Sequence, residues 1–141
     1  MKYIKRERFL LIDDKIKEMI IDNWEPTIGD LFCWINDEEL HNNKVECCTS
    51  DNVVERTKDF KGIKNNCRIP LLTEGNIKDI IYKLTGETVD VKYYDEKEIE
   101  LYSRIHILEK FTYRYNGIEE LDALFDMLVK ICEIKVKESE E

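Results

Sequence analysis

The side chains best able to support catalysis in this sequence are two histidines and five cysteines. A catalytic cysteine needs a neighbouring base to form its thiolate, and only His41 and His106 could supply one. The cysteines contain no C-x-x-C pair and no cysteine–histidine spacing typical of zinc sites; they are Cys33, Cys47, Cys48, Cys67 and Cys132. No Ser/His/Asp order or glycine-rich phosphate loop occurs either. The sequence therefore predicts no catalytic residues and favours a protein that is not an enzyme.

A zinc ion could still be bound if Cys47, Cys67 and His41 converged in the folded chain. Against this, Cys47 and Cys48 are adjacent and would point to opposite faces of a strand. We therefore expect no metal and no cofactor. An odd number of cysteines without paired spacing is typical of reduced thiols, which indicates a cytoplasmic protein.

Aromatic and basic side chains form the strongest candidate for ligand binding. Alternating apolar residues predict strands over 88–94, 99–107 and 111–115, joined by short turns into a three-stranded antiparallel meander. The face opposite the apolar residues would display Tyr94, Tyr102, Arg104, His106 and Arg114. Rings and guanidinium groups on an open sheet suit base stacking and phosphate recognition, so one hypothesis is a nucleotide- or RNA-binding surface. The alternative is a solvent-facing set of cross-strand pairs, such as Glu100 opposite an arginine.

A second candidate surface consists of acidic residues near the C-terminus. A helix is predicted there, beginning at the cap Asn116, and one face would carry Ile118, Leu121, Phe125, Leu128 and Cys132. We call its other side the acidic edge, formed by Glu119, Asp122, Asp126 and Glu133. This edge is either the solvated face that a surface helix needs or a docking surface for a basic partner protein. Trp24 and Trp34 also have two interpretations: they either pack in the core or form part of a surface that binds a partner.

The segments "PTIGDLFCWI" and "LTEGNIKDII" share a pattern that must position these surfaces. Thr27 followed by Asp30 has the form of a capping box, and the apolar spacing after it predicts a short helix over 27–35. Thr73 repeats the pattern and predicts a helix over 73–84, which Gly86 would end. Gly29-Asp30 could instead form a phosphate- or metal-binding turn, but a single glycine does not make a phosphate loop.

The similarity continues at an offset of 46 residues, pairing "VECC" with "VKYY". We therefore predict a duplicated helix-strand-strand unit over 27–55 and 73–101. Two amphipathic helices that are each followed by a strand would also align in part by chance. The alternative to duplication is thus two unrelated segments of similar pattern.

The remaining elements complete a single α+β domain over 1–141, with short helices and antiparallel strands. Asp13 or Asp14 would cap a first helix that ends before Asn23, whereas residues 2–11 fit either a strand or an earlier helical turn. "KVECCT" predicts a strand, and Pro70 restricts "CRIPL" to the edge of a sheet because proline lacks a backbone donor. The C-terminal helix would pack on the meander. Residues 135–141 would form a flexible charged tail.

Composition narrows the classes of partner. The formal net charge is −9, which disfavours binding to the backbone of double-stranded DNA. No apolar run reaches the roughly 18 residues that a membrane span needs, and no export signal opens the chain. We expect a cytoplasmic protein whose partner is another protein or a small ligand.

The "PT" start of a short helix ending in "LFCWI", the central strands and the closing "YNGIEELDALFDMLVKI" resemble small phage and prophage proteins of AT-rich Gram-positive bacteria. The resemblance implies an accessory protein of a mobile element that acts in the cytoplasm of the host cell. Our first hypothesis is a non-enzymatic protein that binds and modulates a host protein through an acidic or aromatic surface. The alternative is the nucleotide- or RNA-binding sheet described above.

Overall fold

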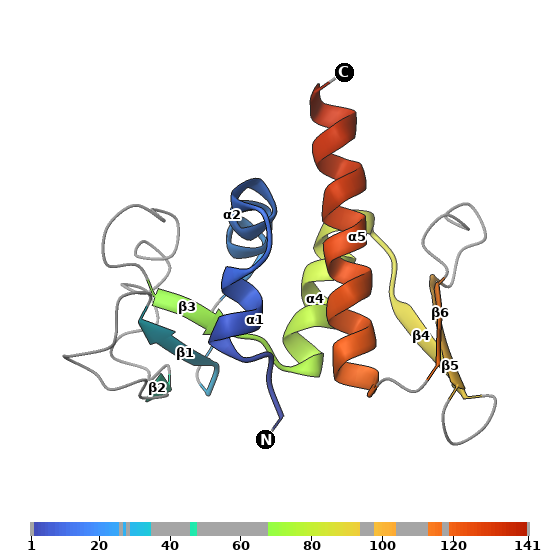
Figure 1. Ribbon diagram of the computed structural model, residues 1–141, viewed down its shortest axis with the longest axis horizontal. Helices are drawn as coiled ribbons and strands as arrows, with labels where there is room; N and C mark the ends of the chain where they lie inside the picture. Colours follow the sequence, from blue (N-terminus) through green and yellow to red (C-terminus); the bar gives the residue numbers. More distant parts are fainter. Residues whose placement is uncertain are drawn as a thin grey trace. The chain divides into compact units, whose positions relative to one another are not determined.

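The computed structural model describes residues 2–25, 27, 29–34, 46–47, 68–93, 98–103, 113–116 and 119–140 (Figure 1). Helices and antiparallel strands both occur in this part of the chain, which confirms the predicted α+β class. Contacts group the chain into two compact units. We call Lys5–Leu72 the N-terminal unit, and Thr73–Glu141 together with Met1–Ile4 the C-terminal unit.

The described part of the N-terminal unit consists of two helices and a three-stranded sheet. The elements are α1 (Arg6–Leu10), α2 (Asp14–Asp22), β1 (Leu31–Trp34), β2 (Glu46–Cys47) and β3 (Arg68–Leu71). The sheet has the order β2-β1-β3, with antiparallel pairing on both sides of β1. Asp13 caps α2 as predicted, because its Oδ1 accepts a hydrogen bond of 2.9 Å from the N–H of Lys15. The ambiguous segment 2–11 contributes helix α1.

Apolar side chains from the helices and the sheet form the core of this unit. Helix α1 contacts β3, and the buried residues include Phe9, Ile16, Ile20, Ile21, Phe32, Cys33, Ile69 and Leu71. Trp24 is also buried, which supports the core interpretation for this residue, whereas the side chain of Trp34 lies outside the description. Pro70 lies in β3 at the edge of the sheet, which confirms the prediction made from its missing N–H.

The helix predicted over 27–35 is wrong, because this segment forms a turn followed by β1. The N–H and the hydroxyl of Thr27 donate to Asp30 Oδ2 at 2.9 and 3.2 Å, as in a capping box, but the N–H of Asp30 donates to the carbonyl oxygen of Thr27 at 3.0 Å and closes a turn. Gly29 has φ of +98°, a left-handed conformation that does not continue into a helix. The apolar run that follows is explained by the central position of β1, where Phe32 and Cys33 are both buried.

The duplicated helix-strand-strand unit is therefore also wrong at its first element. The first copy begins with a turn and a strand, whereas the second begins with helix α4 (Glu74–Thr85). Most of the remaining first copy, 35–45 and 48–55, lies outside the described residues. The shared pattern thus gives two different local structures.

The C-terminal unit contains α4, a second sheet and α5 (Glu120–Glu140). Helix α4 confirms the predicted capping box, because Thr73 Oγ1 accepts from the N–H of Asn76 at 3.3 Å and the N–H of Thr73 donates to Asn76 Oδ1 at 3.1 Å. Gly86 ends the helix, as predicted, with φ of +77°. The sheet is antiparallel in the order β4-β5-β6, made of β4 (Val89–Tyr93), β5 (Glu98–Ser103) and β6 (Tyr113–Asn116). The turns on which the predicted meander depends lie outside the described residues.

Helix α5 is the main packing element of this unit. It contacts α4, which lies beside it in Figure 1, and also contacts β5. Its predicted apolar face is buried at Leu121, Phe125, Leu128 and Cys132, and Ile118 lies outside the description. The predicted cap is wrong, because Asn116 ends β6 and pairs with Glu98, so that the helix begins only at Glu120. The residues predicted as a flexible tail from 135 are helical as far as Glu140.

Candidate functional site

The predicted ligand-binding residues of the second sheet are described only in part. Tyr94, Arg104 and His106 lie outside the described residues, whereas Tyr102 lies in β5 and Arg114 in β6. The backbone register pairs Tyr102 with Asp90, and it places Glu100 between Lys92 and Arg114 in one row across the three strands. The residues in this row alternate in charge, and Glu100 lies opposite an arginine, as the alternative of cross-strand pairs predicted.

The acidic edge lies on the side of α5 that faces away from its buried stripe. With 3.6 residues per turn, Glu119, Asp122, Asp126 and Glu133 fall on one side of the helix axis. The opposite side is formed by Leu121, Leu124, Leu128 and Ile131, all of which are buried. Lys130 belongs to the acidic side and forms an ion pair of 2.9 Å with Asp126. The acidic edge therefore lies on the polar side of the helix, with Lys130 among its carboxylates.

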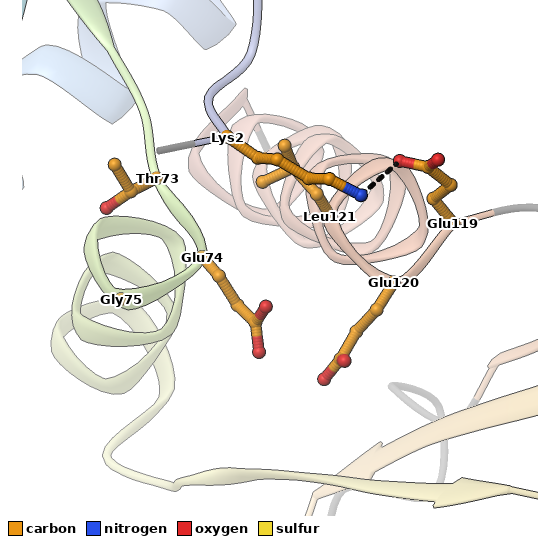
Figure 2. Close-up of a pocket in the computed structure, with 7 residues that line it drawn as sticks. All are labelled: Lys2, Thr73, Glu74, Gly75, Glu119, Glu120 and Leu121. Atoms are coloured by element: carbon orange, nitrogen blue, oxygen red, sulfur yellow. Dashed lines mark hydrogen bonds and ion pairs between the residues drawn. The ribbon is translucent and has the colours of Figure 1, made fainter.

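A cavity of about 560 Å³, which the sequence did not predict, lies at the N-terminal ends of α4 and α5. We call it the glutamate cavity; its lining residues are Lys2, Thr73, Glu74, Gly75, Glu119, Glu120 and Leu121. Figure 2 shows the side chains of Glu74 and Glu120, from the two helices, extending into the same space. Lys2 reaches across Leu121 toward Glu119, with 3.5 Å between Lys2 Nζ and Glu119 Oε2.

Local structure explains why acids gather at this cavity. Glu74 and Glu120 lie in the first turn of their helices, where a negative charge interacts favourably with the helix dipole and with free backbone N–H groups. The capping box of Thr73 fixes the start of α4 at the cavity rim. Packing of α4 against α5 then brings the two helix starts together. Glu119 therefore belongs both to the glutamate cavity and to the acidic edge.

The side chains around the glutamate cavity are already engaged in ion pairs of modest strength. Glu74 Oε1 lies 3.1 Å from Lys78 Nζ, and both side chains are about two-fifths exposed. Lys2 and Glu119 are more exposed, at 79% and 67%. Exposed ion pairs of this kind contribute about 0–1 kcal/mol each to stability. A competing cation could therefore replace Lys2 at Glu119 or Lys78 at Glu74.

The described residues bear on the zinc alternative only in part. Within them, no group of three or more histidine, cysteine, aspartate or glutamate side chains could hold a metal ion. Cys67 and His41, which the zinc alternative requires, lie outside the description, and Cys47 is exposed in β2. The segment Gly29-Asp30 forms the turn before β1, where Asp30 bonds to Thr27.

Cys132 lies on the buried side of α5. Burial, with a smaller contribution from the neighbouring Glu133 carboxylate, raises the pKa of the Cys132 thiol from 9.0 to about 12. The thiol is therefore protonated at neutral pH and packs as a small apolar side chain instead of acting as a nucleophile.

Comparison of the chain with protein families, with curated proteins and with solved structures found no match. In the part of the chain that the structure describes, every helix is too short or too polar to span a bilayer. The arguments for function therefore rest on the acidic edge, the glutamate cavity and the second sheet.

Proposed function

We propose that the protein is a non-enzymatic, cytoplasmic accessory protein of phage type that binds a host protein through the acidic surface of its C-terminal unit. The surface comprises the acidic edge and the glutamate cavity, which share Glu119. Trp24 is buried, so an acidic surface is favoured over an aromatic one that includes this residue.

The observation that carries the proposal is the division of α5 into a buried side and an acidic side. From Glu119 to Glu133 the acidic edge extends about 21 Å along the helix, at 1.5 Å per residue. Buried residues from Leu121 to Cys132 anchor this length to the unit, so the acidic edge is held in one row along the helix, with Lys130 among its carboxylates. Such a row is complementary to a basic segment on a partner, such as a helix with lysine or arginine on one face.

The glutamate cavity would take the end of such a segment. An arginine or lysine side chain entering between Glu74 and Glu120 would meet two carboxylates and would compete with Lys2 for Glu119. The net charge of −9 would attract a basic partner over longer distances and speed association at low salt.

The test compares two variants that lose the same amount of negative charge. The acidic-edge variant carries Asp122→Asn, Asp126→Asn and Glu133→Gln. The control carries Glu7→Gln, Glu18→Gln and Asp22→Asn, whose side chains are exposed on α1 and α2. Each protein is immobilised, incubated with host cytoplasmic extract at low and high salt, and its bound proteins are identified by mass spectrometry.

We expect one basic protein to be enriched by the wild type and by the control, to be lost from the acidic-edge variant, and to be released by high salt. A partner that binds all three proteins equally would refute the acidic surface. If no protein is enriched at low salt by the wild type, the proposed host-protein binding is itself refuted.

A second candidate function is nucleotide or RNA binding by the sheet β4-β5-β6. This candidate draws on the backbone register, in which Tyr102 in β5 is the diagonal neighbour of Arg114 in β6, so that an aromatic and a basic residue occupy nearby positions. We propose that α5 packs on the apolar side of this sheet and leaves the Tyr94, Tyr102, Arg104, His106 and Arg114 side open.

Fluorescence anisotropy with a labelled single-stranded RNA tests this candidate. Binding that weakens with salt and is lost in Arg104→Ala/Arg114→Ala, but not in Lys5→Ala/Lys15→Ala, would support it. Equal effects of the two double variants would indicate nonspecific charge attraction and would argue against a site on the sheet.

A further inference from the structure

We draw no further inference here: the strongest candidate, the glutamate cavity at the N-terminal ends of α4 and α5, belongs to the site already described and consists of acidic side chains at two helix starts, which do not by themselves identify a ligand.

Discussion

At the scale of single residues, Cys132 shows how position changes the chemistry of a side chain. Cys47 is exposed in β2, whereas Cys132 is buried on α5, where its pKa is raised to about 12. In the sequence neither has a C-x-x-C partner, but Cys132 shares the apolar spacing of the C-terminal helix whereas Cys47 lies in a predicted strand. The packing of α5 holds the Cys132 thiol in an apolar core, whereas the Cys47 thiol is exposed.

The raised pKa of Cys132 predicts a specific alkaline effect. Because the folded-state pKa lies above the ordinary value of 9.0, the stability that this thiol contributes is fully present below that pH and is lost as the pH rises toward about 12. Cys132→Ala should lower the free energy of unfolding by about 1–2 kcal/mol near neutral pH. The difference in the free energy of unfolding between the wild type and Cys132→Ala should then shrink as the pH rises from about 9 to about 11.

Urea denaturation of the two proteins across this pH range measures the difference. Lysine and tyrosine titrations are common to both chains, so they cancel in the comparison. A difference in the free energy of unfolding that stays constant with pH would show that the folded thiol titrates normally.

At the scale of elements, Thr27 and Thr73 show that one local pattern can begin a turn or a helix. In both places the threonine N–H donates to a side chain three residues later. The Thr73 hydroxyl accepts from the N–H of Asn76, which completes the helix cap, whereas the N–H of Asp30 donates to the carbonyl oxygen of Thr27 and closes a turn. The outcome at Thr27 depends on β3, because Leu31 pairs with Leu71 and Phe32 with Pro70, contacts that local spacing does not reveal.

Alanine substitution should separate the two threonines. Thr73→Ala removes the cap of a 12-residue helix and should lower the free energy of unfolding by about 1 kcal/mol. Thr27→Ala removes one exposed hydrogen bond in a turn and should cost less than about 0.5 kcal/mol. Chemical denaturation measures both changes, and equal losses would contradict the difference between helix cap and turn.

The sequence predicted elements whose cause is local and missed those whose cause is distant. The apolar stripe of α5 follows from helical periodicity, and the two ends of α4 follow from the Thr73 cap and from Gly86. Pro70 restricts β3 to the edge of its sheet because proline lacks a backbone N–H. The start of α5 was misplaced because Asn116 is paired with Glu98 in the sheet. The acidic edge was visible in the sequence, whereas the glutamate cavity also needs Lys2, 117 residues before Glu119.

At the scale of the whole molecule, the chain passes between its two units after Ile4 and again after Leu72, and the sequence has no linker at the second boundary. Thr73 is the cap of α4, so the boundary falls at the start of a helix and not in a Gly/Ser-rich segment. Each unit buries aromatic side chains of its own in the described part: Phe9, Trp24 and Phe32 in the first and Phe125 in the second. The prediction of a single domain came from chain length and composition, and the contacts group the chain into two compact units.

A leucine pair tests this division of the core. Leu128 is fully buried in α5, whereas Leu11 is 85% exposed after α1. Leu128→Ala should lower the free energy of unfolding of the C-terminal unit by about 2–5 kcal/mol, and Leu11→Ala should change stability by less than about 0.5 kcal/mol. Hydrogen exchange followed by mass spectrometry reports each unit through its own peptides.

We expect Leu128→Ala to weaken protection in peptides from 73–93 and 119–140 more than in peptides from 5–34, because its contacts belong to the C-terminal unit. Equal loss of protection throughout the chain would instead mean that the two units unfold as one cooperative body.

The place of Lys2 beside Glu119 bears on how the protein should be handled in the laboratory. A purification tag fused ahead of Met1 would put foreign charges next to the carboxylates of the glutamate cavity. A tag fused after Glu141 would instead start at the exposed end of α5, about 30 Å along that helix. Attachment through the C-terminus therefore leaves the cavity in its native state for binding assays.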